Sequence, residues 1–406
     1  MATKQMYDLA YQFRATKLWD FLEDVDLFAV RFSDGETGYC SVMGHGGEHY
    51  ALAVYVGEDG LRSLWKTLRL DPMDPIAETE MGCSQTCLMC SFESKDYLSP
   101  EELAEVRAYA AEVGKRLAGK NAFAQFTCYR AGRMGWHIEA EEDCRYICEA
   151  LRAAVGIKGL LFEHSKFELG FPGLFEQEEY VPLFTQADGR WTASKASFSC
   201  PDGAWEAPQY ENELVTERIR RKKKQGAWEC GTTYLPAPIQ LDPEEEEAPY
   251  YPLALLCVKR SNGRVLDPPV ISESGEPQEL LEDFTVCLRE AGCPNTIYAG
   301  DDRCFFLLQD LCRRTGIRLI RDHEPRHLFE AMLDLLDDME DDDEDDENDN
   351  EDVDEDEALE QLCATLMAMS DREFKRMPKA MARKLLALGG LGMIPAELVK
   401  RLKELV

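Results

Sequence analysis

The chain has 406 residues, a hydrophobic content of 45% and a formal net charge of −33 at pH 7. A chain of this length is expected to fold as two or three domains, and its hydrophobic content excludes disorder throughout. The acidic balance repels duplex DNA and anionic lipid, so nucleic acid is not an expected partner and neither is a membrane surface.

The N-terminal sequence and the cysteines predict where the protein resides. MATKQMYDLAYQF lacks the apolar core of a signal peptide, and no stretch of about 18 apolar residues occurs in the chain. The fifteen cysteines follow no regular spacing, which is typical of reduced thiols. We therefore expect a cytoplasmic protein without a disulfide framework.

Residues 1–205 are predicted to form an α+β domain. Apolar residues at helical spacing predict helices over 4–22, 60–70, 99–117 and 139–156. Aromatic and β-branched runs predict strands over 26–32, 37–44, 49–56, 86–93, 122–130, 180–186 and 190–198. Tight turns between consecutive strands favour an antiparallel sheet with helices on one face.

Residues 206–225 are predicted to be a helical connector, exposed to solvent. It contains the basic run at residues 218–224. A lone basic run in an acidic chain is more often a solvated helix face than a nucleic-acid contact, and we interpret it in that way.

Residues 226–335 are predicted to form an α/β domain. Strands are expected over 250–260, 264–272, 295–300 and 317–322, and helices over 276–292, 302–316 and 324–336. The first two strands form a hairpin around the Ser-Asn-Gly turn at 261–263. The later strands each follow a helix, which predicts parallel pairing through right-handed crossovers.

The C-terminal part of the chain is predicted to be a linker followed by a helical domain. Residues 337–357 contain 17 acidic residues and no basic one, so residues 336–357 are expected to be a disordered acidic linker. Without this run the chain still carries a net charge of −16. Residues 358–406 are expected to form a small helical domain with a basic surface.

The element order over residues 250–335 resembles the ribonuclease H-like fold shared by nucleases and integrases. The resemblance implies that carboxylates on the first strand, after the fourth strand and on a late helix hold two magnesium ions. Asp301 and Asp302 follow the later strand, and Glu330 or Asp334 lies on the last helix.

Lys259 occupies the place where counting back from the turn puts the first-strand carboxylate. An ammonium group there repels metal ions. We therefore predict a ribonuclease H-like fold without nuclease activity, in which Lys259 pairs with Asp301 or Asp302.

A second resemblance rests on the block G-x-x-G-E-x-x-x-L-A-V-Y-x-G-x-x-G-L. The matching residues are Gly44, Gly47, Glu48, Leu52, Ala53, Val54, Tyr55, Gly57, Gly60 and Leu61, and LMCSFE with the helix after it also matches. Over residues 1–335 the chain resembles a family of uncharacterised bacterial proteins. The resemblance implies a bacterial cytosolic protein and supplies no activity.

The same block contains His45, Glu48 and His49, which match the zinc motif H-x-x-E-H. That motif needs a helix to bring both imidazoles to one face, and glycines inside a helix are unfavourable. Strand-like runs flank these glycines. We therefore predict a turn between two strands at residues 44–49, and a zinc hydrolase only as the alternative.

Cys83, Cys87 and Cys90 are a second candidate zinc set, for which the fourth ligand would be Cys128, Cys144, Cys148 or His137. One C-x-x-C without a matched second pair is a weak signal. The alternative is that residues 87–92 alternate along a strand, and that Cys144 and Cys148 pack on a helix. Zinc binding here is left open.

The sequence favours a non-catalytic interaction or regulatory protein of unknown function, whose expected partner is a protein. It assigns no catalytic, cofactor-binding or metal-ligating residue and no cofactor. The alternatives are a divergent metal-dependent nuclease that uses Asp301, Asp302 and Glu330, and the zinc hydrolase at His45, Glu48 and His49.

Overall fold

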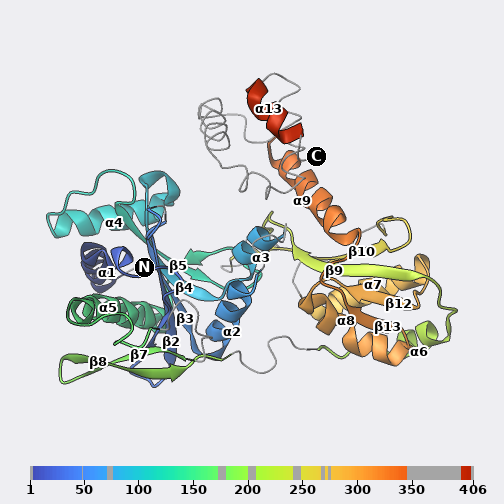
Figure 1. Cartoon of the computed structure of the whole chain (residues 1–406), viewed down its shortest axis with the longest axis horizontal. Coiled ribbons are helices and arrows are strands. Elements are labelled where there is room, and N and C mark those ends of the chain that lie inside the picture. The colour runs from blue at the N-terminus through green and yellow to red at the C-terminus, as the bar shows by residue number, and fades with distance from the viewer. Residues whose placement is uncertain are drawn as a thin grey trace. The chain divides into compact units, whose positions relative to one another are not determined.

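The computed structural model describes residues 3–47, 49–70, 76–171, 180–199, 207–240, 248–266, 270–272, 276–344 and 395–403. The chain falls into two compact units, residues 1–340 and residues 341–406. The first unit contains an eight-stranded and a five-stranded sheet, each with helices (Figure 1). The predicted α+β class is confirmed. In the described part of the chain, no helix has the length and apolar composition that crossing a bilayer requires.

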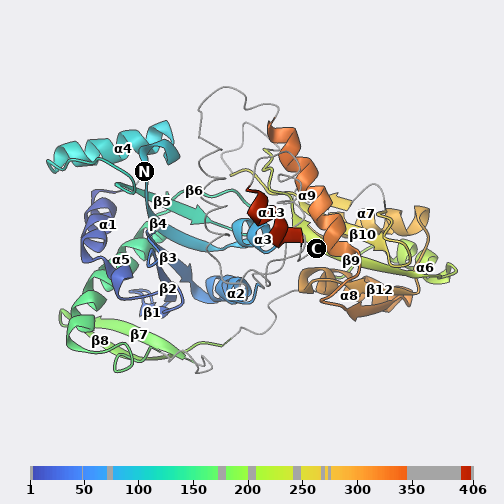
Figure 2. The ribbon, with the colours of Figure 1, turned by 45° about the horizontal axis from the view of Figure 1, so that its top comes forward.

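The first sheet has the strand order β6-β5-β4-β3-β2-β1-β7-β8. Its strands are β1 (Phe28–Arg31), β2 (Thr37–Met43), β3 (Ala51–Val56), β4 (Cys87–Glu93), β5 (Phe123–Tyr129), β6 (Trp136–His137), β7 (Tyr180–Ala187) and β8 (Arg190–Ser197). Neighbours pair antiparallel except β1 and β7, which pair in parallel. The hairpin of β7 and β8 therefore forms the edge away from β5 and β6 (Figure 2).

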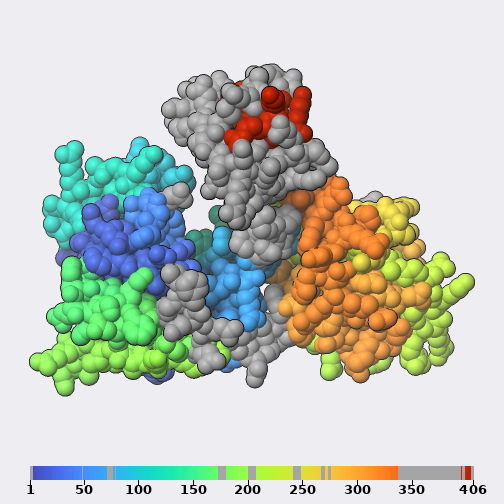
Figure 3. Space-filling view, viewed as in Figure 1, coloured from blue at the N-terminus to red at the C-terminus, as the bar shows by residue number. Residues whose placement is uncertain are grey.

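Helices cover both faces of the first sheet. The helices in this part of the chain are α1 (Lys4–Thr16), α2 (Gly57–Leu68), α3 (Ala77–Ser84), α4 (Pro100–Glu112) and α5 (Glu141–Glu163), of which α3 contacts the second sheet. Helices α1, α4 and α5 share one core with the sheet, and α1 lies between the other two (Figure 3). Leu61 and Leu64 of α2 pack on the opposite face. The prediction of helices on one face only is therefore wrong.

The predicted turn between two strands in the glycine-rich block is confirmed. β2 ends at Met43, β3 begins at Ala51, and the two strands pair antiparallel. Gly44 and Gly47 have φ values of 120° and 88°, which side chains disfavour, and the Gly47 N–H donates to the Gly44 carbonyl. Glu48 lies outside the described residues.

The second sheet has the strand order β11-β10-β9-β12-β13. Its strands are β9 (Ala227–Tyr234), β10 (Leu253–Lys259), β11 (Val270–Ser272), β12 (Thr296–Ala299) and β13 (Arg318–Arg321). The central strand β9 pairs antiparallel with β10 and parallel with β12, which in turn pairs parallel with β13. β11 pairs antiparallel with β10. The parallel pairing of the later strands is confirmed.

The sequence prediction missed β9. Its sequence AWECGTTY places an acidic residue and a glycine inside a strand that is buried over most of its length. A Cβ at Gly231 would lie 2.6 Å from the end of the Met332 side chain and 2.8 Å from that of Leu328, so a larger residue there has to displace side chains of α9. Lys259 therefore ends the second strand of this sheet, opposite Trp228, and does not lie on the first.

Four helices pack on the second sheet, namely α6 (Glu213–Arg221), α7 (Pro277–Glu290), α8 (Asp302–Thr315) and α9 (Leu328–Glu344). Ile219 of α6 is buried in the core that α7 and α8 share, so the helix predicted to be exposed is docked. Leu328 and Met332 of α9 pack on the other face.

Helix α9 ends at Glu344, so residues 337–344 of the acidic run are helical, where an extended linker was predicted. The rest of the predicted linker lies outside the described residues, as do the predicted helices between 358 and 394. In the second unit the structure describes α13 (Ala396–Lys403), where the last helix was predicted.

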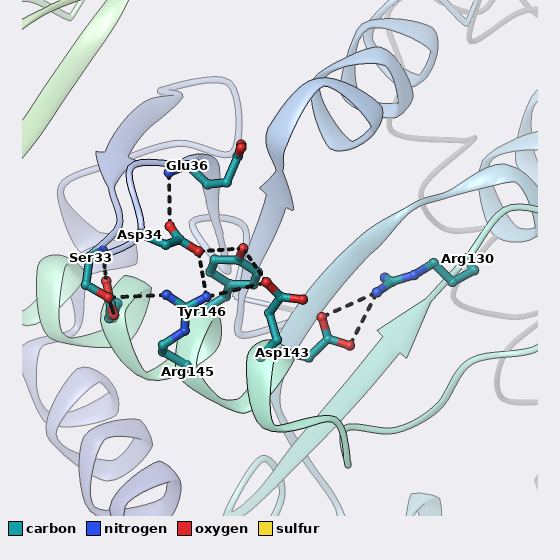
Figure 4. Close-up of polar contacts among 9 residues, drawn as sticks. Ser33, Asp34, Glu36, Arg130, Asp143, Arg145 and Tyr146 are labelled. Atoms are coloured by element: carbon teal, nitrogen blue, oxygen red, sulfur yellow. Dashed lines mark hydrogen bonds and ion pairs between the residues drawn. The ribbon is translucent and has the colours of Figure 1, made fainter.

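A polar network ties the β1–β2 turn to α5 (Figure 4). One Asp34 oxygen accepts from Arg145 at 2.6 Å and from the Tyr146 hydroxyl at 2.9 Å, and the other accepts from the Glu36 N–H at 3.0 Å. The hydrogen bond from Arg145, followed by that from Glu36, lowers the pKa of Asp34 to about 2. The ionised carboxylate is therefore the form that the fold stabilises.

We predict that Asp34→Asn removes an acid-sensitive part of the folding stability. The folded-state pKa of about 2 lies below the ordinary value of 3.8. The stabilisation is therefore present above about pH 4 and is lost as the pH falls toward about 2. Urea unfolding across this range should show the difference between wild type and Asp34→Asn shrinking with acidity. Asp188→Asn, at the exposed β7–β8 turn, is the control, and a pH-independent difference for Asp34→Asn would contradict the assignment.

Candidate functional site: a cleft between α2 and the second sheet

Charged and aromatic side chains surround a cavity of about 580 Å³, which we name the α2–β12 cleft. One wall comes from α2, α3 and the residues after α2. The other comes from β9, the β12–α8 junction and the end of β13. The lining residues are Arg62, Trp65, Lys66, Arg69, Leu70, Ile76, Glu80, Ser84, Thr232, Gly300, Asp301, Asp302, Arg303, Phe306, Arg321 and His323.

Helix α2 contributes a basic stripe to the cleft. Its members recur at helical spacing, namely Arg62, Trp65, Lys66 and Arg69. The apolar residues between them face the first sheet. The stripe was visible in the sequence as R-x-x-W-K-x-x-R. Sequence analysis missed it because it used the apolar stripe of the helix alone.

The Trp65 ring has two close neighbours. It stacks on Phe198 with ring centroids 5.0 Å apart, and the Arg69 guanidinium lies 4.9 Å from its centroid. What it offers the cleft is its indole N–H, which is a donor only.

On the opposite wall, Asp301 serves as a structural clamp. Its carboxylate accepts from the Thr232 N–H at 2.7 Å and the Thr232 hydroxyl at 2.8 Å, and it caps α8 through the Cys304 N–H at 2.7 Å. Burial raises the pKa of Asp301 above its ordinary value, although these hydrogen bonds oppose the shift. The clamp fixes β12 to β9 at their carboxyl ends.

Asp302 and Arg321 form an ion pair across the mouth of the cleft, with Oδ1 and Nη1 3.2 Å apart. The Arg321 guanidinium also lies 4.4 Å from the Phe305 ring centroid. Both side chains remain partly exposed, so a ligand can reach them.

Glu80 of α3 and Arg303 of α8 form a bidentate ion pair at the base of the cleft. Their side chains are 14% and 13% exposed. Burial opposes the charge on Arg303, but the carboxylate of Glu80 raises its pKa overall. Beside this pair, Cys83 of α3 lies in the core of the second sheet. Helix α3 thus joins the two sheet assemblies.

Two nitrogen atoms on the cleft walls are buried without a hydrogen-bond partner among the residues that the structure describes. They are Arg62 Nε and Trp65 Nε1. Asp302 Oδ1 is also buried, and it has the Arg321 guanidinium 3.2 Å away as its counter-charge. Buried polar groups are almost always paired, and an unpaired one costs about 1–3 kcal/mol. Two donors without partners on one wall of the cavity indicate a ligand that supplies acceptor groups.

The two histidines of the H-x-x-E-H motif have separate partners. His45 Nδ1 lies 2.9 Å from the Trp19 carbonyl, whereas His49 Nδ1 lies 3.5 Å from Glu93. The structure does not bring these imidazoles together at one site.

The three candidate zinc cysteines lie in three different cores. Cys83 is in the core of the second sheet, and Cys87 and Cys90 lie on opposite faces of the first. Residues 87–92 therefore alternate between the two faces of the sheet, as the alternative to zinc binding predicted. Burial raises the pKa of Cys83 and of Cys87 to about 12, which disfavours thiolate ligands. Cys144 and Cys148 likewise pack in the α5 core.

The three nuclease candidates do not converge either. Asp301 clamps Thr232, Asp302 pairs with Arg321, and Glu330 is exposed in the first turn of α9. Among the described residues, no group of three acids, histidines or cysteines is placed to hold a metal ion.

The predicted pairing of Lys259 with Asp301 or Asp302 is wrong. Thr232, which holds Asp301, stands opposite Leu255 of β10, and Lys259 is four residues further along that strand. Four residues of a strand span about 13 Å. The error follows from the missed strand β9, which displaced the count of strands by one.

His137 shows a polar cluster that the sequence did not reveal. Its Nδ1 lies 3.6 Å from Glu102, and its Nε2 lies 3.7 Å from Glu105. Burial opposes ionisation of Glu102, but hydrogen bonds led by that from His137 lower its pKa to about 2. The cluster links β6 to α4 and is separate from the α2–β12 cleft.

The two walls of the cleft come from regions of the chain that match two different protein-family models. Residues 4–170 match a domain of unknown function, DUF7309, and residues 216–336 match another, DUF6930. No curated protein matches the chain. The chain therefore combines two domains of unknown function, and neither description names an activity. Arg62 and Glu80 come from the first matched region, and Asp302 and Arg303 come from the second.

We predict that Glu80→Gln lowers the free energy of unfolding by about 3–5 kcal/mol, because it leaves the buried Arg303 guanidinium without its counter-charge. Urea unfolding of the full chain measures this loss. Glu217→Gln, which breaks an exposed pair with Arg220 on α6, is the matched control and should change the value by at most about 1 kcal/mol. Equal effects of the two substitutions would contradict a special role for the buried pair.

Proposed function

We propose that the protein is a non-catalytic regulatory protein that binds a small organic anion in the α2–β12 cleft. The observation that carries this proposal is the pair of buried donors without partners, Arg62 Nε and Trp65 Nε1, on the wall of one cavity. A volume of about 580 Å³ lies within the range of ordinary small-molecule sites.

The chemistry of the walls defines the ligand. Arg62 Nε and Trp65 Nε1 require an acceptor, and the neighbouring cations of α2 favour one that is negatively charged. Asp302 is already paired with Arg321, so it sets no requirement of its own. A phosphorylated or carboxylated metabolite supplies the acceptors that both donors require.

We also propose that the second sheet and its helices form a ribonuclease H-like fold. Its support is the observed order β11-β10-β9-β12-β13, with three antiparallel strands followed by two strands parallel to the first. In this proposal β9 is the first strand, and Glu229 replaces Lys259 as the residue to compare with the family's first carboxylate.

Glu229 has a structural role that competes with metal binding. It is fully buried, accepts from the N–H groups of His327 and Leu328 at 2.9 and 3.2 Å, and lies 3.5 Å from Arg260. A metal ion bound there has to displace the guanidinium and take the acceptor from the N-terminus of α9. These contacts support the proposal that the domain has no nuclease chemistry.

The cellular setting is proposed from the sequence. The block at residues 44–61 supports a bacterial, cytoplasmic protein, and the acidic surface favours a protein as the macromolecular partner. In this proposal the occupied cleft is what that partner detects.

We predict that wild-type protein binds at least one of three probe anions, namely AMP, ribose 5-phosphate and citrate, in calorimetry. Trp65→Phe keeps the ring but removes the N–H, and is expected to weaken that binding about tenfold through the loss of one charge-assisted hydrogen bond. Trp136→Phe, in the first sheet away from the cleft, is the control and should bind normally. If none of the probes binds, or if both variants bind like wild type, the proposed ligand site is wrong.

We further predict no magnesium- or manganese-dependent cleavage of single strands, duplexes or RNA–DNA hybrids, because the candidate carboxylates are committed to structural contacts. The assay uses the purified full chain. A cleavage activity that persists through repurification and disappears in Asp301→Asn or Asp302→Asn would establish the nuclease alternative instead.

A further inference from the structure

A second electropositive region lies on the first sheet assembly and shares no residue with the α2–β12 cleft. Two hollows of about 690 and 640 Å³ flank the loop that follows α4, and Lys115 and Lys120 line both. We name the six cations around them the α1–α4 basic surface. They are Arg14, Lys17, Arg107, Lys115, Arg116 and Lys120.

The positive charge of this surface is not neutralised by its neighbours. None of the six cations forms an ion pair with a residue that the structure describes, and the two hollows contain only Asp20 and Asp96 as acidic lining residues. Burial, followed by the charge of Arg14, lowers the pKa of Lys115. Six cations without an ion-pair partner are unexpected in a chain whose net charge is −33, and they call for a functional explanation.

The shape of the surface favours a long ligand over a compact one. The two hollows meet at Lys115 and Lys120, so a bound anion can follow the surface from Lys17, after α1, to Arg107 on α4. Figure 3 shows α1 and α4 side by side on this face. Lysine acts as a mobile point charge, which suits a flexible chain of anionic groups.

The aromatic rings nearby are already engaged. The Lys115 ammonium lies 3.8 Å from the centroid of the Tyr11 ring, and the same ring stacks on Tyr109. The Trp19 ring packs against Tyr50 at 4.7 Å. Binding of single-stranded nucleic acid commonly uses free aromatic faces for the bases. This surface offers charge without such faces.

We propose that the α1–α4 basic surface binds an extended chain of phosphate groups, namely inorganic polyphosphate. Each phosphate that meets a cation releases counterions, so the affinity falls steeply with salt. The α1–α4 basic surface shares no lining residue with the α2–β12 cleft, so variants of either one test it separately.

The test measures binding of short-chain polyphosphate to the full chain at several salt concentrations. Lys115→Glu/Lys120→Glu is expected to reduce affinity at least about tenfold and to lower the slope of log affinity against log salt by about 1 to 2. The matched control is Arg218→Glu/Lys223→Glu, which reverses the same number of charges in the other basic run and should bind like wild type. Thermal unfolding establishes that both variants are folded.

Oligodeoxythymidine and poly-glutamate complete the experiment. Weaker binding of both than of polyphosphate supports the assignment. Tighter binding of the oligonucleotide overturns it in favour of nucleic acid, and equal binding of poly-glutamate overturns it in favour of general anion attraction. Loss of polyphosphate binding in the Arg218/Lys223 control, or its retention in the Lys115/Lys120 variant, also overturns it.

Discussion

The buried ion pair of Glu80 and Arg303 is the contact on which the geometry of the cleft depends. Its partners are 223 residues apart in sequence and come from regions that match different domain families. A charge that leaves water needs its counter-charge close by, so each partner fixes the position of the other. Around the pair, Ile76 just before α3 and Cys83 within it add apolar contacts with the second assembly. The cleft therefore belongs to the combination of the two domains, and neither one contains it alone.

Two acidic side chains in the second assembly act as acceptors for backbone N–H groups. Asp301 satisfies the start of α8 and a strand amide, and Glu229 satisfies the start of α9. Both carboxylates lie at the N-terminal end of a helix. The backbone N–H groups there have no partner within the helix and carry positive partial charge, which favours a carboxylate. Carboxylates at the ends of strands are easily taken for metal ligands. In this chain their partners show a different role.

Most helices and strands were predictable because apolar spacing is a local property of the sequence. The alternation at Cys87–Phe92 and the basic stripe of α2 are both visible in the printed chain. β9 was not predictable in this way, because Glu229 and Gly231 fit it only once α9 is packed against it. The cleft could not be predicted from the sequence for the same reason. Trp65 and Asp302 become neighbours of one cavity only through tertiary contacts.

The parallel pairing of β1 with β7 has a consequence for synthesis on the ribosome. Strands β1 to β6 are complete by His137, but the partner of β1 does not emerge until about 40 residues later, beyond the first matched region at residue 170. Until then the nascent sheet presents β1 as an open edge, with apolar residues on both faces. Open edges template pairing between chains. The β7–β8 hairpin thus closes the sheet late, and the interval before it arrives is when the growing chain is most exposed to misassembly.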